Sequence, residues 1–152
     1  MTIDMFSFNE MDLRTLYEVL DLRNRVFVEE QNCVYLDTDY KDFNAYHLLL
    51  RDDKNKLVAY SRLLPPGVSY EKEASIGRVV TSPDVRGEGL GKILMQESLT
   101  RIRALFPGYP VKIEAQSYLI PFYTGFGFRP IGDDYLLDGI LHREMILPAV
   151  DL

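Results

Sequence analysis

Residues 86–92 read Arg86-Gly87-Glu88-Gly89-Leu90-Gly91-Lys92, a glycine-rich stretch around which the rest of the chain is organised. Residues 74–81, just before it, have the composition of a strand, and residues 89–106 have the apolar spacing of a helix. The first N–H groups of a helix lack partners within the helix, and the helix dipole adds partial positive charge there. Glycines let the backbone approach a ligand closely. The stretch therefore predicts a site for a phosphate-bearing ligand.

Two other phosphate-binding loops fit this stretch poorly. A Walker loop begins with a glycine where this chain has Arg86, and it follows Lys92 with a hydroxyl residue where this chain has Ile93. A dinucleotide loop needs a third glycine at the position of Lys92, and no βαβ unit begins the chain. The spacing argues against nucleoside triphosphates and dinucleotides as ligands.

The composition predicts one globular domain over residues 1–152, with 47% apolar and 26% charged residues. The net charge of −6 argues against nucleic-acid binding and weakly favours a cationic partner. Cys33 is the one cysteine, so no intrachain disulfide can form. Neither a secretory signal nor a run of about 20 apolar residues is visible, so we expect a cytoplasmic protein without a membrane partner.

Apolar periodicity and turn residues predict an order of elements β-α-β-β-β-α-β-α-β-β. The strands are expected at 3–8, 45–50, 56–64, 74–81, 111–116, 127–131 and 140–147. The helices are expected at 12–30, as one helix or two, at 89–106 and within 117–125. Most charged residues of the first helix, with Arg23 as one of them, are expected to lie on its solvent-exposed face. This order predicts a mixed sheet with surrounding helices, in the α/β or α+β class.

Three acids, Asp37, Asp39 and Asp42, lie close together in a predicted loop over residues 31–42. They do not form a calcium loop of the EF-hand type, because the sixth and twelfth positions from Asp37 are not glycine and glutamate. Two interpretations remain open. The loop is either a polar surface loop or an acidic rim that attracts a cationic amine.

Two motifs resemble those of the GNAT acetyltransferases. Arg86-x-x-Gly89-x-Gly91 resembles the Arg/Gln-x-x-Gly-x-Gly/Ala loop that cradles the pyrophosphate of acetyl-CoA in that family. One helix and one strand later, residues 122–128, which read Phe-Tyr-Thr-Gly-Phe-Gly-Phe, resemble the family's second coenzyme motif. The order of elements extends the resemblance over nearly the full length. It implies the GNAT acyl-CoA N-acyltransferase fold, a mixed, mostly antiparallel sheet flanked by helices.

The chain is also similar to the small ElaA-like subgroup of this family. The similar residues are Leu22, Arg23, Val26, Phe27, Val28, Glu30, Gln31, Cys33, Tyr35, Asp37, Asp39, Glu114, Ala115, Gln116, Asp138, Gly139, Ile140 and His142. Leu141 stands where a proline is expected, which is a small departure.

The resemblance implies an enzyme that moves an acetyl group from acetyl-CoA to a primary amine by direct attack, without a metal. The residues that it implies for the cosubstrate are Val79, Val80 and Thr81 for the pantetheine arm, Arg86, Gly87, Glu88, Gly89, Leu90, Gly91 and Lys92 for the pyrophosphate, and Phe122 with Tyr123. Tyr123 would donate a proton to the coenzyme thiolate. The acceptor would be a small-molecule or peptide amine. A non-catalytic acyl-CoA sensor of the same fold is the alternative.

The general base has two candidates, Glu114 and His142. A carboxylate can act through a water molecule, and a histidine ordinarily changes protonation near neutral pH. Arg78 is expected either to bind an acceptor carboxylate or to pair with Glu114, and His47 is expected to be structural. Cys33 is not expected to act as a nucleophile. An exposed edge strand would allow a homodimer.

Overall fold

The computed structural model describes residues 1–150. The strands are β1 (Thr2–Ser7), β2 (Tyr46–Arg51), β3 (Leu57–Leu64), β4 (Ser75–Thr81), β5 (Val111–Gln116), β6 (Arg129–Leu137) and β7 (Ile140–Leu147). The helices are α1 (Leu13–Arg23), η2 (Asn24–Glu30), α2 (Leu90–Leu105) and α3 (Ile120–Thr124), with short 3-10 turns η1 (Phe8–Glu10), η3 (Lys41–Asn44), η4 (Pro83–Val85) and η5 (Ser117–Leu119). The predicted order of elements is confirmed.

One strand is longer than the sequence predicted. We expected the sixth strand to end at residue 131, but β6 continues to Leu137. Gly132 has a φ of +66°, and the register against β7 shifts between Ile131 and Tyr135. The glycine allows an irregularity inside the strand, after which the ladder resumes.

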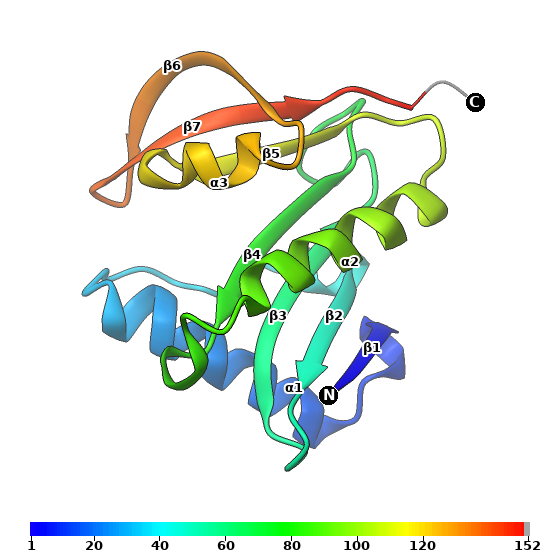
Figure 1. The fold of residues 1–152 in the computed structure, drawn as a ribbon, viewed down its shortest axis with the longest axis vertical. Helices are drawn as coiled ribbons and strands as arrows, with labels where there is room; N and C mark the ends of the chain where they lie inside the picture. Colours follow the sequence, from blue (N-terminus) through cyan, green and yellow to red (C-terminus); the bar gives the residue numbers. More distant parts are fainter. Residues whose placement is uncertain (151–152) are drawn as a thin grey trace.

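The strands form two antiparallel sheets, in the orders β1-β2-β3-β4 and β5-β7-β6. The sheets meet where Ala74 forms a parallel bridge with Val111, and the Lys112 N–H donates to the Ala74 carbonyl at 2.8 Å. Figure 1 shows that β4 and β5 separate from this junction onward. The result is a V-shaped opening between two adjacent strands, and it positions the site described below.

Helices cover both faces of the first sheet, which explains why β3 is buried along its whole length. Leu48 and Leu50 of β2 pack in one apolar cluster with Leu94 of α2, whereas Leu49 packs in another with Val19 of α1. Successive side chains of a strand point to opposite faces, so the alternation on β2 assigns one face to each helix. Helix α2 lies across the front of the first sheet in Figure 1.

The first helical segment is broken in two, as the sequence allowed. Asp12 caps α1 by accepting a hydrogen bond from the Thr15 N–H at 2.7 Å. After Arg23 the chain widens into the π-helix η2, with the Cys33 N–H bonded to the Val28 carbonyl five residues earlier. Such π turns are frequent at functional sites. Here the wider turn leads the chain from α1 to the opening between the sheets.

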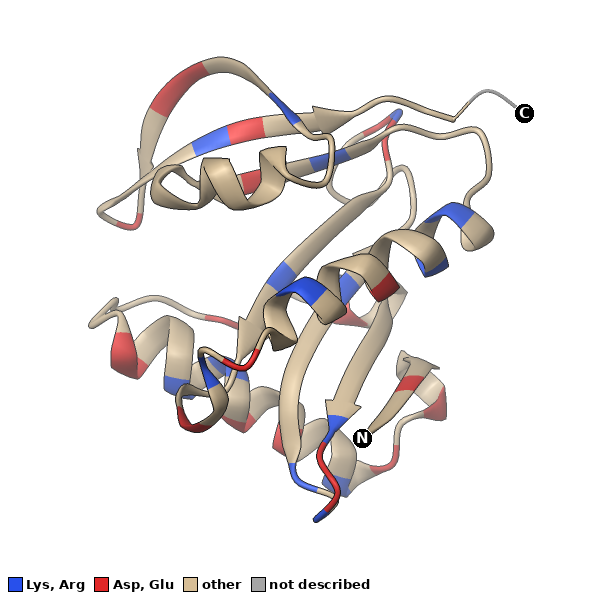
Figure 2. Cartoon of the chain, viewed as in Figure 1, with Lys and Arg blue, Asp and Glu red and all other residues tan. Residues whose placement is uncertain are grey.

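Acidic and basic residues are interspersed along α1 and α2 (Figure 2). This distribution differs from the one-sided basic face that is typical of nucleic-acid binders. Among residues 1–150, no helix has the length and apolar character needed to cross a membrane.

Candidate active site

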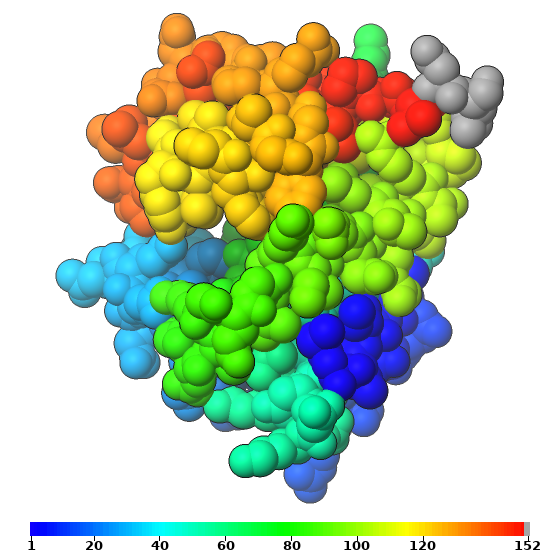
Figure 3. Space-filling model, viewed as in Figure 1, coloured from blue at the N-terminus to red at the C-terminus, as the bar shows by residue number. Residues whose placement is uncertain are grey.

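A cavity of about 450 Å³ occupies the opening between β4 and β5. Figure 3 shows the surface hollowed where α3, the segment around η2 and the loop before α2 meet. Its lining includes nine of the residues predicted to be catalytic or to bind the coenzyme, namely Val79, Val80, Thr81, Arg86, Gly91, Glu114, Phe122, Tyr123 and His142. Gly87, Glu88, Gly89, Leu90 and Lys92 belong to the adjacent loop and the first turn of α2 and do not line the cavity.

The glycine loop has the geometry of an anion site. Gly87 and Gly89 have φ values of +85° and +76°, a region that side chains with a Cβ rarely adopt. Gly89 is the N-cap of α2 and has no side chain to bond the first N–H groups of that helix. These groups remain available to a ligand, and the helix dipole adds positive charge to them.

The two motifs predicted to hold the coenzyme are adjacent in space. A Cβ added at Gly91 would lie 3.8 Å from the Phe122 ring. Phe122 in turn packs edge-on against Tyr123, with ring centroids 5.2 Å apart. The start of α2 therefore lies beside the aromatic end of the cavity.

Arg86 connects the glycine loop to η2. Its guanidinium lies 2.6 Å from the Glu30 carboxylate and donates to the Thr81 carbonyl at 3.4 Å. Both side chains of the ion pair are partly exposed, so this contact contributes little to stability but fixes the position of Arg86 beside the cavity. No pattern in the sequence predicted this pairing.

The β4 wall of the cavity contains a bulge. Tyr60 lies opposite Val80, but Arg62 lies opposite Gly77, so β4 has one more residue than β3 between these pairs. Arg78 sits in the bulge with a φ of +48°, which costs on the order of 1 kcal/mol for a residue other than glycine. A bulge leaves backbone groups outside the ladder, here next to Val79.

The bulge is held by ion pairs that correct the prediction for Arg78. The Arg78 Nε lies 2.9 Å from Asp37, and its terminal nitrogen donates to the Asp37 carbonyl at 3.0 Å. Arg78 therefore pairs with the acidic loop and not with Glu114, because its side chain points from the bulge toward residues 37–39. The same contact occupies the guanidinium that was expected to be available for an acceptor carboxylate.

The three acids of the loop form a cluster of ion pairs with three arginines, which we call the Arg–Asp cluster (Arg23, Asp37, Asp39, Asp42, Arg62 and Arg78). Asp37 and Asp42 are 4% and 6% exposed. Arg23 is fully buried and binds both, at 2.7 and 2.8 Å. The predictions of an acidic rim and of a solvated Arg23 were therefore wrong, and the surface-loop prediction holds only in part, because residues 32, 34, 36, 38 and 40 are exposed whereas Asp37 and Asp42 are buried. Burial is possible because each charge has an opposite partner.

Tyr123 lies at the aromatic end of the cavity. It is 7% exposed, and its ring packs against Phe128 at 6.1 Å between centroids. Burial raises the pKa of its hydroxyl to about 12, so the phenol stays protonated at neutral pH. The hydroxyl has no hydrogen-bond partner among residues 1–150, although the side chain lines the cavity. The arrangement presents a proton donor to the cavity.

The two candidate bases differ in their surroundings. His142 is 9% exposed, and its Nδ1 donates to the Ile140 carbonyl at 2.8 Å, so Nε2 carries the free lone pair. Glu114 is exposed and accepts a hydrogen bond from the Tyr135 hydroxyl. Tyr135 also stacks on His142, with 6.3 Å between ring centroids. His47, expected to be structural, is fully buried and bonds Tyr60 at 2.7 Å.

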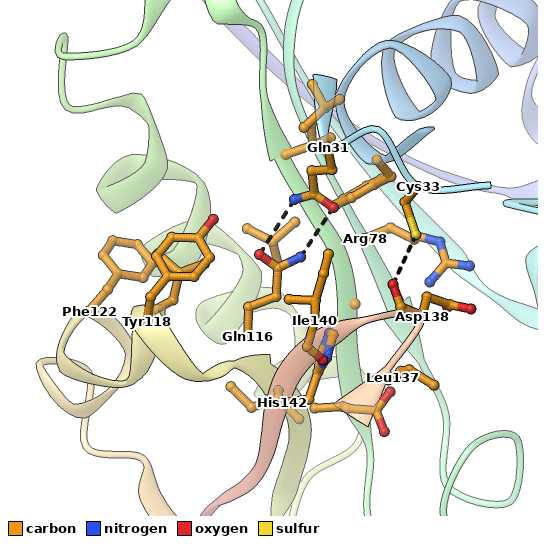
Figure 4. Close-up of a pocket in the computed structure, with 18 of the residues that line it drawn as sticks. Gln31, Cys33, Arg78, Gln116, Tyr118, Phe122, Leu137, Asp138, Ile140 and His142 are labelled. Atoms are coloured by element: carbon orange, nitrogen blue, oxygen red, sulfur yellow. Dashed lines mark hydrogen bonds between the residues drawn. The ribbon is translucent and has the colours of Figure 1, made fainter. Parts of the chain in front are cut away.

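Two glutamines that the sequence did not connect meet across the cavity. Gln31, which follows η2, and Gln116, at the end of β5, exchange hydrogen bonds of 3.3 and 3.4 Å (Figure 4). Beside them, the Cys33 thiol contacts the Asp138 carbonyl at 3.3 Å. Each partner lies 85 or more residues from the other along the chain, so local patterns carry no signal of these contacts.

Comparison with known proteins agrees with this geometry. The family model for the Acetyltransferase (GNAT) domain matches residues 23–148. Protein ElaA of Escherichia coli is 41% identical over 138 residues, which cover 90% of this chain and 90% of ElaA.

Solved structures show the same relationship. The crystal structure of Escherichia coli ElaA aligns with a TM-score of 0.89 and 37% identity, covering 95% of this chain and 97% of that one. An acyl-CoA N-acyltransferase from Pseudomonas aeruginosa aligns with a TM-score of 0.90 and 38% identity, with the same coverage. The fold and the ElaA-like resemblance expected from the sequence are confirmed. The chain belongs to the GNAT acetyltransferase family, whose reaction is acyl transfer from acyl-CoA.

Proposed function

We propose that this protein is an N-acetyltransferase that moves an acetyl group from acetyl-CoA to a primary amine by direct attack. The observation that carries the proposal is a cavity lined by two groups that lack a hydrogen-bond partner among residues 1–150: the protonated hydroxyl of Tyr123 and the Nε2 lone pair of His142. A proton donor and a proton acceptor are what aminolysis of a thioester requires.

The residues around the cavity fit an acyl-CoA. The N–H groups at the start of α2, with Arg86 beside them, suit the pyrophosphate. The backbone of Val79, Val80 and Thr81 lines the cavity and suits the pantetheine arm. The backbone groups freed by the bulge at Arg78 suit the developing charge on the thioester oxygen. The cosubstrate supplies an acyl group activated as a thioester.

The proposed reaction uses His142 as base and Tyr123 as acid. The Nε2 atom of His142 removes a proton from the acceptor amine, whose nitrogen forms a bond to the thioester carbon. The carbon–sulfur bond breaks, and Tyr123 donates its proton to the leaving sulfur. Solvent then returns the lost proton to the tyrosine and removes the gained proton from the histidine. Glu114 remains the second candidate for the base, through a water molecule.

A thermal-shift panel tests the coenzyme site. Acetyl-CoA and CoA should raise the melting temperature, because a ligand at 100 times its Kd stabilises the folded state by about 2.7 kcal/mol. ATP and NAD at the same concentration should not, since the loop lacks their spacing. A shift with ATP or NAD in place of the CoA ligands would contradict the assignment of the glycine loop.

Release of the CoA thiol distinguishes an enzyme from a sensor. Steady thiol production that depends on an added amine supports the enzyme. Acetyl-CoA binding without thiol release from any amine would instead identify a sensor of the same fold.

The pH dependence of turnover tests the base. In His142→Gln we expect kcat/KM to fall by about 10²-fold or more and the limb of the pH–rate profile that reports the base to disappear. The matched variant Glu114→Gln should keep that limb, because its carboxylate is exposed and bonded to Tyr135. If the pH–rate profile changes in Glu114→Gln alone, Glu114 and not His142 is the general base. A profile unchanged in both variants would reject both residues.

Other expectations from the sequence stay predictions. They are that residues 1–152 form one domain, that the enzyme acts in the cytoplasm on a small-molecule or peptide amine, and that an edge strand allows a homodimer. Size-exclusion chromatography with light scattering measures the last directly.

A further inference from the structure

The Gln31–Gln116 pair divides the cavity. In Figure 4, Tyr118 and Phe122 lie on one side of the two amides, and Leu137 and His142 lie on the other. The first side is next to the glycine loop through the contact of Phe122 with Gly91. The second side contains the proposed base. The amide pair therefore lies where the acyl group and the acceptor amine have to meet.

The pairing itself is weak and exchangeable. Its two bonds of 3.3 and 3.4 Å are longer than the 2.9–3.0 Å typical of N–H···O bonds. Each amide has two N–H donors and two acceptor lone pairs but uses one of each in the pair. Neither amide bonds any other side chain among residues 1–150. A ligand can therefore replace the pairing or join it without breaking a strong contact.

Four of the charged residues that line the cavity are already engaged. Arg78 is bound by Asp37, Glu114 accepts from Tyr135, and Glu30 pairs with Arg86. The acids of the loop over residues 31–42 are engaged as well, because the arginines of the Arg–Asp cluster pair with their carboxylates. The two neutral amides are therefore among the groups of the cavity that are free to recognise an acceptor, and the exposed Asp138 also lines the cavity.

We propose that Gln31 and Gln116 recognise the acceptor and that the acceptor carries an amide next to its amine, as an amino-acid amide or a peptide N-terminus does. Each glutamine of the pair offers one N–H donor and one carbonyl acceptor to its partner. A substrate amide also carries an N–H donor and a carbonyl acceptor, so it can bond either glutamine in the same way. A carboxylate supplies only acceptors, and a simple alkylamine or polyamine supplies no carbonyl. This inference rests on the proposed acetyltransferase function and names its substrate class.

Three small amines of similar size test the inference: alaninamide, alanine and isobutylamine. Thiol release should give a kcat/KM for alaninamide at least about tenfold above that of either of the others, because a site built to bond a polar group rejects analogues that lack it. Equal values for alaninamide and isobutylamine, or a preference for alanine, would overturn the inference and leave the acetyltransferase function in place. Binding of acetyl-CoA without thiol release from these three or any other amine would overturn both.

Two variants connect the preference to the glutamines. In Gln116→Leu and Gln31→Leu we expect KM for alaninamide to rise about tenfold, the preference over isobutylamine to disappear, and the thermal shift with acetyl-CoA to persist. Gln96→Leu is the matched control, because Gln96 is exposed on α2 outside the cavity, and its kinetics should not change. An equal fall in kcat/KM for alaninamide and isobutylamine would assign the glutamines a purely structural role and contradict the proposal.

Discussion

Replacing Tyr123 by phenylalanine should lower kcat by about 10²- to 10⁴-fold, the range ordinarily lost with a general acid. The substitution removes one oxygen from a side chain that is 7% exposed and leaves the ring packing with Phe122 and Phe128 in place. That oxygen has no hydrogen-bond partner among residues 1–150, so its removal leaves no other polar group without a partner. Acetyl-CoA affinity should therefore stay within about twofold, because the loss is confined to the transition state.

The experiment combines kcat from thiol release with the Kd for acetyl-CoA from titration calorimetry. Tyr109→Phe serves as the control, because Tyr109 is 46% exposed and lies outside the cavity lining. Unchanged turnover in Tyr123→Phe would remove the assignment. Loss of acetyl-CoA binding would show that the hydroxyl acts in binding and not in proton transfer.

The parts of the fold that the sequence predicted are those with local signals. The spacing of Leu94 and Ile102 along residues 89–106 marks the buried face of α2. Alternation of Val111, Ile113 and Ala115 marks the buried face of β5. The glycines of the loop adopt left-handed φ values that their residue type permits. In each case, the residues that decide the structure are within a few positions of one another.

The parts that the sequence could not predict depend on distant partners. Arg23 follows a helical pattern that is compatible with a solvent-facing side chain, yet Asp37 and Asp42 fold back over it 14 and 19 residues later. A non-glycine residue with positive φ, as at Arg78, is rare, and the ion pair with Asp37 is what holds it. The Gln31–Gln116 contact depends on the two sheets separating, which no local pattern encodes.

The Arg–Asp cluster supports the site and not only the fold. It connects α1 through Arg23 to the loop at Asp37, and from there to the bulge at Arg78 that forms a wall of the cavity. Arg62 of β3 contributes a bidentate pair to Asp39 at 2.8 Å for each bond. The loop, for which an acidic substrate rim was one of two interpretations from the sequence, thus supports the cavity wall from behind.

Replacing Arg23 by methionine should destabilise the protein by about 3–5 kcal/mol, the usual result of removing one partner from a buried ion pair. Arg23 is fully buried, and without it Asp37 and Asp42 have fewer partners. Arg25→Met is the control: its pair with Asp21 is exposed, so the change should stay below about 1 kcal/mol. Urea unfolding measures both free energies. A loss below about 1 kcal/mol in Arg23→Met would contradict the role of the cluster.

The same cluster gives the stability a pH dependence whose direction can be derived. Burial alone would raise the pKa of Asp39, but the hydrogen bonds and charge of Arg62 outweigh it and lower the pKa from 3.8 to about 2. For Asp42, burial likewise opposes the hydrogen bond and charge of Arg23, and the net pKa is lowered. A lowered folded-state pKa contributes stability that is present above the unfolded pKa and is lost as the pH falls from about 4 toward 2. In Arg23→Met, acid protonates carboxylates that have lost a partner, so the difference in unfolding free energy from the wild type should shrink below pH 4. A difference that stays constant with pH would mean that Arg23 stabilises the protein by packing alone and not by its charge.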